Sequence, residues 1–220
     1  GVRAIADKYG KRVLFDSARF VENAYFIKTR EAGYADKTIK EICREMFDLA
    51  DGMTMSSKKD GLVNMGGFIA TRHEDWYEGA KGFCIRYEGF LTYGGMSVRE
   101  MEAIVVGLDE SMDEDIISQG PMFIEYMAKE LHKRGVPVVL PAGGLGCHIN
   151  ASEFVSHIPH EQYPAGALAA ALYIAGGIRG MERGTLSEQR NEDGSERYAE
   201  LELLRLAMPP ASLSSSRAEP

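Results

Sequence analysis

The sequence has few cysteines, no long apolar run and no surplus of positive charge. Its three cysteines, Cys43, Cys84 and Cys147, are far apart and form no CxxC pair, which argues against a disulfide framework or a zinc site and favours a reducing, cytoplasmic environment. No apolar stretch approaches the roughly 18–20 residues that cross a bilayer. The net charge is −8, whereas nucleic-acid binders need a surplus of lysine and arginine. We therefore expect small molecules and other protein subunits as partners, with no nucleic acid and no membrane.

The first half of the chain alternates between two hydrophobic patterns. Alternating strands and helices predict an α/β fold whose sheet is at least partly parallel. Helical spacing is found at residues 2–9, 20–31 and 37–50, a buried strand is expected at residues 11–16, and two further strands at residues 53–57 and 62–70.

The second half predicts a long helical stretch followed by a smaller α+β domain. Residues 97–134 are mostly helical in pattern, with a break near Gly120-Pro121. A further helix is expected near residues 163–175, and strand-like runs at residues 177–181 and 200–208. We place one domain at residues 1–113 and a small domain with its bridging helix at residues 114–208. The tail, residues 209–220, is rich in Ser, Pro and Ala, which predicts disorder.

Two short segments contain the residues suited to chemistry. FDSAR places Asp16 at the carboxyl end of a predicted strand, with Arg19 three residues later. SSKKD places Ser56, Lys58 and Lys59 just after another predicted strand. Ligands bind at the carboxyl ends of strands in open α/β sheets, and one strand–helix–strand crossover can bring these two ends together.

This combination suits a carbonyl cofactor with a pyridine ring and a phosphate. A lysine that forms a Schiff base must lose its proton, and the neighbouring Lys58 would lower the pKa of Lys59. A carboxylate such as Asp16 would keep a pyridine nitrogen protonated. Ser56 and Lys58 would bind a phosphate through charge-assisted hydrogen bonds.

Each of these residues also has an ordinary structural interpretation. A KKD turn is usually a solvated charged loop. An Asp that ends a strand, such as Asp16, is often only the N-cap of the next helix. Arg19 would more often be a surface cation than a ligand. The residues alone therefore indicate an α/β enzyme and no more.

A resemblance extends this interpretation. The segments LFDSARFVENAYFIK, MTMSSKKDGLVNMGGF, YEGFLTYGGM, GIRGMERGTLSEQR and LLRLAMP resemble, in the same order and at the same spacing, the tryptophanase and tyrosine phenol-lyase family of fold-type-I pyridoxal-phosphate enzymes. The resemblance implies that residues 1–113 are part of a large cofactor-binding domain of the aspartate-aminotransferase type. Residues 114–208 would be the smaller C-terminal α+β domain.

The resemblance also implies roles for the residues of both segments. Lys59 matches the lysine that binds the cofactor covalently, and Asp16 matches the aspartate that faces the pyridine nitrogen. Arg19 matches the arginine near the phenolic oxygen of the cofactor, and Ser56 and Lys58 match residues on the phosphate side.

Further positions match residues that bind substrate or a cation. Arg205 matches the arginine that holds the substrate α-carboxylate. Met181 and Arg183 match the tyrosine phenol-lyase form, in which the arginine faces the phenol hydroxyl, and we interpret this as a preference for tyrosine over tryptophan. The alternative for Arg183 is a salt bridge to Glu182 or another carboxylate. Asn64 falls where the family builds part of a monovalent-cation site, for potassium, through a main-chain oxygen.

The implied reaction is β-elimination of an aromatic L-amino acid to phenol or indole, pyruvate and ammonia. Family members form tetramers, so a homo-oligomer is expected. Two other interpretations stay open. The chain could be another fold-type-I enzyme, such as an aminotransferase or an aldolase-like lyase, or it could be an inactive truncated subunit.

The sequence also departs from the family pattern. The family often has GGHAxF where this chain reads GGLGCHIN, so that Leu145 replaces a histidine and His148 lies three residues further on; whether His148 compensates is open. The N-terminal portion of the family has no counterpart here. We therefore expect the chain to be a piece of a longer protein, and by itself to bind cofactor weakly and to have little activity.

Overall fold

The computed structural model describes residues 1–208, which form two compact units. The N-terminal unit ends at Ser118 and the C-terminal unit begins at Gln119, whereas the sequence analysis placed this boundary after residue 113. The assignment of the units as a cofactor domain and a small domain stays a prediction. The tail predicted to be disordered lies outside the described residues.

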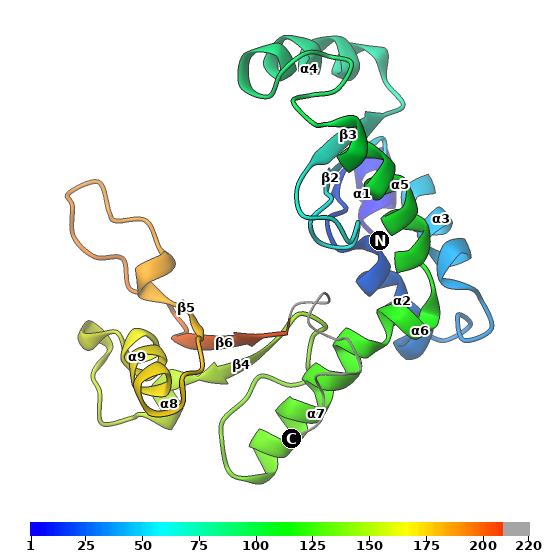
Figure 1. The fold of residues 1–220 in the computed structure, drawn as a ribbon. Helices are drawn as coiled ribbons and strands as arrows, with labels where there is room; N and C mark the ends of the chain where they lie inside the picture. The colour runs from blue at the N-terminus through cyan, green and yellow to red at the C-terminus, as the bar shows by residue number, and fades with distance from the viewer. Residues whose placement is uncertain (209–220) are drawn as a thin grey trace. The chain divides into compact units, whose positions relative to one another are not determined.

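A three-stranded sheet forms the centre of the N-terminal unit (Figure 1). It consists of β1 (Leu14–Asp16), β2 (Gly52–Ser56) and β3 (Gly67–Thr71), in the order β1-β2-β3. β1 is parallel to β2, and β3 is antiparallel to it. The predicted, partly parallel α/β sheet is therefore confirmed. β3 begins later than predicted because residues 57–66 form a turn, closed by a hydrogen bond from Ser57 N to Gly66 O of 3.0 Å.

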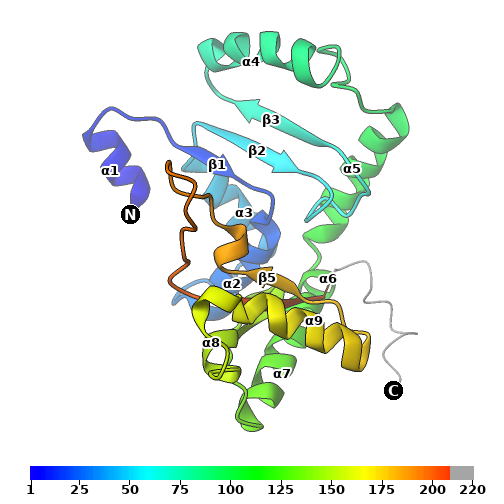
Figure 2. The same ribbon diagram turned by 90° about the vertical axis from the view of Figure 1, so that its left-hand side faces the viewer.

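The three helices predicted before residue 51 are confirmed, and a fourth was not predicted. α4 starts with Glu74 and Asp75. Acidic residues in the first turn stabilise a helix because they lie at the positive end of its dipole. Figure 2 shows α4 beyond the β3 edge of the sheet. The helices of this unit are α1 (Val2–Lys8), α2 (Phe20–Arg30), α3 (Ile39–Asp48), α4 (Glu74–Tyr87), α5 (Val98–Ser111) and α6 (Glu114–Ile117).

The core of the N-terminal unit lies where α2 and α3 pack against β2. A capping box starts α3, with Glu41 N donating to Thr38 Oγ1 at 3.2 Å and Thr38 N donating to Glu41 Oε2 at 2.8 Å. The prediction of a buried strand at residues 11–16 is wrong, because β1 is at the edge of the sheet and Leu14 is 57% exposed. The buried core residues are Phe20, Val21, Ala24, Ile39, Ile42, Cys43 and Met55.

An antiparallel sheet in the order β4-β6-β5 forms the centre of the C-terminal unit. The predicted break at Gly120-Pro121 is displaced: both residues lie in the first turn of α7, where proline is tolerated. β5 starts at the last residue of the run predicted as a strand. The elements are α7 (Gln119–Lys133), β4 (Gly146–Asn150), α8 (Ala151–Phe154), α9 (Pro164–Gly176), β5 (Met181–Arg183) and β6 (Leu203–Ala207), with short 3₁₀ turns at His160–Gln162 and Thr185–Ser187.

One face of this second sheet is buried. Cys147 of β4 packs against Ile124 and Ala128 of α7, and all three are at most 2% exposed. Leu204 of β6 is fully buried. Because side chains alternate along a strand, the residues next to Cys147 and Leu204 point to the opposite face. His148 and Arg205 therefore lie on the open face.

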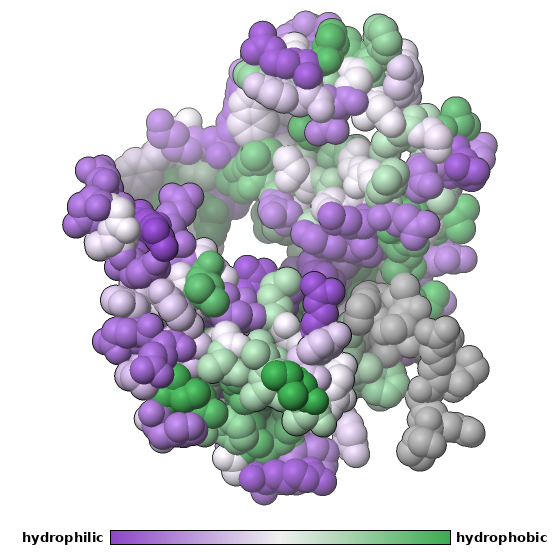
Figure 3. All heavy atoms as spheres, turned by 60° about the vertical axis from the view of Figure 1, so that its left-hand side comes forward, coloured by the Kyte–Doolittle hydropathy of each residue, from purple (hydrophilic) through white to green (hydrophobic). Residues whose placement is uncertain are grey.

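Large hydrophobic side chains also remain on the surface. Figure 3 shows hydrophobic residues among hydrophilic ones on the visible face. Tyr87 and Val105 of the N-terminal unit are each 70% exposed, and Ile174 of the C-terminal unit is 84% exposed. Exposed apolar surface of this kind is typical of interaction surfaces.

Candidate active site

Lys59 lies in a tight turn directly after β2. Lys59 N donates to Ser56 O at 3.2 Å, and Leu62 N donates to Lys59 O at 3.2 Å. Leu62 has a φ of 53°, a left-handed conformation that is uncommon for a non-glycine residue. Lys59 is half-buried and Lys58 is exposed. The turn therefore holds the two lysines at the carboxyl end of a central strand.

Asp16 lies at the carboxyl end of the neighbouring parallel strand. It is in register with Thr54 of β2, and adjacent strands are about 4.8 Å apart. Ser17, which is fully buried, links the two strand ends: its N and its Oγ donate to Thr54 O at 2.9 and 2.8 Å. The structure thus brings together the two predicted segments, FDSAR and SSKKD.

Asp60 connects the lysine turn to the start of α2. Its Oδ2 accepts hydrogen bonds from Val21 N at 2.8 Å and Glu22 N at 3.2 Å, so it binds the free N–H groups of the first turn of that helix. Asp60 is only 4% exposed, which contradicts the solvated-loop interpretation of the KKD turn at this residue. The sequence analysis did not identify Asp60, although it is the last residue of the SSKKD motif.

This cap also decides the alternative interpretation of Asp16. The Oδ1 atom of Asp16 accepts a hydrogen bond from Ala18 N at 3.2 Å, within the turn that follows β1. The first-turn N–H groups of α2 are bound by Asp60 instead. Asp16 is exposed and is not the side-chain cap of that helix, so its carboxylate is available at the strand end.

Arg19 lies between two carboxylates. Its Nη1 is 3.5 Å from Glu22 Oε2 and 3.9 Å from Asp60 Oδ1. Burial raises the pKa of both Glu22 and Asp60, and the Arg19 charge acts in the opposite direction on each. Arg19 is not the isolated surface cation of the ordinary interpretation, because its side chain is only 22% exposed.

The residues around these strand ends fit pyridoxal phosphate. In the part of the chain that the structure describes, the side chains of Ser56, Lys58 and Lys59 make no hydrogen bond or ion pair. One amine is therefore available for the aldehyde, and a hydroxyl and a second ammonium for the phosphate. Asp16 supplies the carboxylate that a pyridine nitrogen needs.

Asn64 lies in the turn between β2 and β3 and is exposed. Among the described residues, no group of three or more His, Cys, Asp or Glu side chains is arranged to hold a metal ion. A monovalent-cation site built from main-chain oxygens would not be found in this way, so the potassium site stays a prediction.

The C-terminal unit brings together the residues predicted to bind substrate. In the register of the sheet, Arg205 of β6 has His148 of β4 on one side and Met181 of β5 on the other. Arg205 Nη2 lies 3.0 Å from Met181 Sδ. Arg183, two residues after Met181, lies on the same face of the sheet and is exposed.

The alternative interpretation of Arg183, a salt bridge to Glu182, does not hold in this structure. Neighbouring residues of a strand point to opposite faces, and Glu182 Oε2 accepts a hydrogen bond from Ser187 Oγ at 3.3 Å. Within residues 1–208, Arg183 forms no ion pair. Its guanidinium group is therefore available to a ligand.

His148 is the neighbour of Arg205 that the sequence analysis left open. Burial is the main cause that lowers the pKa of His148, and the positive charges of Arg205 and Arg183 also lower it. A hydrogen bond with the Gly146 backbone acts in the opposite direction. The net effect is a lowered pKa, which favours the neutral form of the imidazole. Leu145, which stands where the family often has histidine, precedes β4 and is half-buried.

The start of β6 is held by a second buried carboxylate. Glu202 is fully buried, and it accepts hydrogen bonds from Thr185 N at 2.6 Å and from Ala165 N, at the start of α9, at 3.2 Å. A side chain at Gly184 would place its Cβ 2.5 Å from Glu202 Oε1, so this approach requires glycine. Glu202 therefore fixes the strand that carries Arg205 three residues later.

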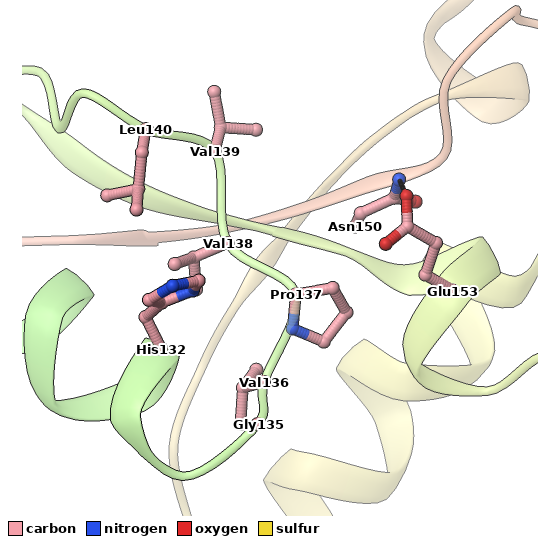
Figure 4. Close-up of a pocket in the computed structure, with 9 residues that line it drawn as sticks. All are labelled: His132, Gly135, Val136, Pro137, Val138, Val139, Leu140, Asn150 and Glu153. Carbon is pink, nitrogen blue, oxygen red and sulfur yellow. Dashed lines mark hydrogen bonds between the residues drawn. The ribbon is translucent and has the colours of Figure 1, made fainter.

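A pocket of 510 Å³ lies elsewhere in the C-terminal unit (Figure 4). It is formed by the segment after α7 together with the end of β4 and α8. At one side of it Asn150 Nδ2 donates to Glu153 Oε1 at 2.7 Å. None of the predicted site residues lines it; its lining consists of His132, Gly135, Val136, Pro137, Val138, Val139, Leu140, Asn150 and Glu153.

None of the helices within residues 1–208 combines the length and apolar character that crossing a membrane requires.

Sequence comparison identifies relatives with lyase names. A family model described as beta-eliminating lyase matches residues 1–216. The chain is 56% identical over 209 residues to a probable beta-eliminating lyase of Trichomonas vaginalis. It is 50% identical to a tryptophanase of Salinibacter ruber and 47% identical to a tyrosine phenol-lyase of Pasteurella multocida, each over 209 residues. These alignments cover 94–95% of this chain and 44–46% of the relatives, so the chain spans about half of their length.

Structural comparison identifies enzymes of the fold-type-I class. A putative L-allo-threonine aldolase of Listeria monocytogenes has a TM-score of 0.57 and 17% identity, and the match covers 98% of this chain and 51% of that one. A serine palmitoyltransferase of Sphingomonas wittichii has a TM-score of 0.59 and 16% identity, with 97% and 46% covered. These likenesses confirm the predicted fold class, and the sequence relatives confirm the predicted resemblance. The chain belongs to the beta-eliminating lyase family.

Proposed function

We propose that this chain supplies the cofactor-binding lysine and the substrate-binding arginine of a pyridoxal-phosphate lyase that cleaves the Cβ–Cγ bond of an aromatic L-amino acid. The observation that carries the proposal is the position of Asp16 and Lys59 after adjacent parallel strands. Asp60, and not Asp16, caps α2, which leaves the Asp16 carboxylate for a ligand.

Each residue of the N-terminal unit would act on a particular part of the cofactor or substrate. Lys59 provides the amine for the cofactor aldehyde and, once released, removes the α-proton of the substrate as a general base. Asp16 holds a proton on the pyridine nitrogen, and Ser56 and Lys58 bind the phosphate. Arg19 would bind on the side of the phenolic oxygen of the cofactor. When bound, pyridoxal phosphate withdraws the electrons that the α-proton leaves behind.

The residues of the C-terminal unit would orient the substrate. Arg205 binds the α-carboxylate through its planar guanidinium group. Arg183 binds the hydroxyl of a phenol leaving group beside Met181, which would favour tyrosine over tryptophan. The free guanidinium of Arg183 supports this finer proposal, while relatives named for both substrates have similar identities. With tryptophan the Arg183 donor would lack the phenol hydroxyl as a partner, which would make tryptophan the poorer substrate.

We also propose a homotetramer and a potassium ion bound in part by the main-chain oxygen of Asn64. Exposed apolar side chains, among them Tyr87 and Val105, are consistent with further protein surface covering this chain. The similarity to the threonine aldolase shows a shared fold and nothing about the reaction, so no observation favours an aldolase over the lyase.

The test uses the protein encoded by the complete gene, loaded with pyridoxal phosphate. We expect a visible absorbance band and the release of pyruvate from tyrosine at a higher kcat/KM than from tryptophan. Lys59→Ala should abolish the band and lower kcat by about 10²–10⁴-fold or more. The matched control, Lys58→Ala, should weaken cofactor affinity but keep the band at saturating cofactor.

Two results would contradict these proposals at different levels. A Lys59→Ala protein that still forms the band and pyruvate would exclude Lys59 as the cofactor lysine. A higher kcat/KM for tryptophan than for tyrosine would leave the lyase intact and overturn only the role of Arg183.

A further inference from the structure

The open face of the β4-β6-β5 sheet contains three side chains that can bind an anion. His148 and Arg205 are directly opposite each other in the antiparallel pair, so their Cβ atoms are about 4.5–5.5 Å apart and point to the same side. Arg183 lies on this face one pleat beyond Met181, the other neighbour of Arg205. The GGHAxF pattern that the family often has places a phenylalanine where this chain has His148.

We propose that His148, Arg183 and Arg205 form one anion-binding face, in which His148 is a second hydrogen-bonding group for the ligand carboxylate that Arg205 holds. This inference rests on the proposed function for the identity of the ligand, an aromatic amino acid. It adds a substrate-positioning residue that a phenylalanine at this position could not replace.

The space around Arg205 supports a shared site. Gly146 lies on the same face of β4, and a Cβ there would be 2.9 Å from Arg205 Cγ, so the glycine leaves room for the arginine stem. Arg205 Nη2 lies 3.0 Å from Met181 Sδ, on the side away from β4. The side towards β4 is where the half-buried His148 lies. A carboxylate bound to Arg205 would therefore lie next to the imidazole of His148.

Within residues 1–208, the charged groups that act on the pKa of His148 are two arginines. Arg205 comes from β6 and Arg183 from β5. The segment before β4 contributes a backbone contact, in which Val139 N donates to His148 O at 2.8 Å. Helix α7 packs on the opposite face, against Cys147.

These charges couple ligand binding to the proton of His148. Burial and the two guanidinium groups lower the pKa of His148, which favours its neutral form in the free protein. A bound carboxylate would offset the nearest positive charge, and this would raise the pKa of His148. Anionic ligands should therefore bind more tightly as the pH falls through the pKa of His148.

The experiment follows the histidine NMR signals of the protein encoded by the complete gene during titration with two probes. The first probe, 3-(4-hydroxyphenyl)propanoate, has the ring and the carboxylate of tyrosine but no amine, so it cannot react with a cofactor aldehyde. The second, tyramine, has the ring and the amine but no carboxylate. We expect the first probe to shift the His148 signal and raise its pKa, and tyramine to leave both unchanged.

Variants separate a ligand contact from a general structural role. His148→Phe should weaken binding of the carboxylate probe about tenfold, as the loss of one hydrogen bond to a charged group does. His148→Gln keeps an N–H donor and should restore most of the affinity. The matched control is His157→Phe, which alters an exposed histidine of the same unit and should leave the affinity unchanged.

The inference is overturned if the carboxylate probe leaves the His148 signal and its pKa unchanged, or if His148→Phe binds the probe as tightly as the unmodified chain. An equal response to tyramine would also overturn it. The proposed function fails separately: a complete protein without pyruvate release would reject the lyase, whereas the proton-coupled carboxylate site would stand.

Discussion

Asp60 of the N-terminal unit and Glu202 of the C-terminal unit are buried carboxylates with the same structural role. Each accepts two backbone hydrogen bonds, at least one of them from the first turn of a helix that lies more than 35 residues away in the sequence. Each is also close in sequence to a residue of the candidate site: Asp60 follows Lys59, and Glu202 is three residues before Arg205.

The surroundings of the two carboxylates differ. Asp60 has cations beside it, with Arg19 Nη1 at 3.9 Å and the charge of Lys59 acting on its pKa. Glu202 has backbone N–H groups and His160 Nε2 at 3.5 Å. The negative charge of Asp60 therefore takes part in the electrostatics of the candidate site in the N-terminal unit. Glu202 instead holds the start of β6, the strand that contains Arg205. In the described part of the chain, it contacts none of the charged residues predicted to bind substrate.

The largest effect is expected for Glu202→Leu. This change leaves two buried N–H groups, of Ala165 and Thr185, without an acceptor, and each such group costs about 1–3 kcal/mol. We expect the free energy of unfolding of the C-terminal unit to fall by about 3 kcal/mol in urea denaturation. Glu202→Gln is the matched comparison: Ala165 N and Thr185 N donate to different carboxylate oxygens, so its single amide oxygen can accept from only one of them and it should recover part of the loss. A Glu202→Leu protein as stable as the unmodified chain would refute the structural role.

A smaller effect on stability, with an additional effect on binding, is expected for Asp60. Asp60→Ala should destabilise the N-terminal unit by about 2 kcal/mol, since the N–H groups of Val21 and Glu22 lose their acceptor at the edge of the core. Asp60→Asn should restore the stability but still bind pyridoxal phosphate about tenfold more weakly, because Arg19 loses one of the two carboxylate charges beside its guanidinium. If Asp60→Asn restores both properties, the two buried carboxylates do not differ as argued here.

The Asp60 and Arg205 sites show which parts of the molecule the sequence could predict. Alternating strand and helix patterns place Asp16 and Lys59 at adjacent strand ends, because a parallel pair requires one crossover. Asp60 could not be recognised as buried, since its hydrogen bonds to Val21 and Glu22 connect residues 39 and 38 positions apart.

The C-terminal sheet was harder to predict for a related reason. The row of His148, Arg205 and Met181 depends on the register of three strands, and a shift of one residue would turn each side chain to the other face. The sequence contains no turn signal that fixes this register. The roles predicted for Arg205, Met181 and Arg183 therefore came from the resemblance, and the role proposed for His148 required the structure.

Asp51 extends the comparison to a carboxylate at the surface. Its side chain is 20% exposed and interacts with His73 Nε2 at 3.0 Å, Val13 N at 2.7 Å and Arg3 Nη1 at 2.6 Å. The hydrogen bond with His73, then those with Val13 and Arg3, hold the pKa of Asp51 far below its usual range. Burial has the opposite effect on Asp60, whose pKa is raised.

The two aspartates should therefore give opposite dependences of stability on pH. The contribution of Asp51 is present above the unfolded-state pKa of about 3.9 and is lost as the pH falls below it. The raised pKa of Asp60 makes its contribution largest at low pH, and this is lost as the pH rises through the folded-state value. In urea denaturation between pH 3 and pH 6, Asp51→Asn should flatten the loss of stability at acid pH, and Asp60→Asn should steepen it. Curves of the same slope for both variants would show that the pKa values of the two aspartates do not shift in opposite directions, and the contrast between the buried Asp60 and the partly exposed Asp51 would fail.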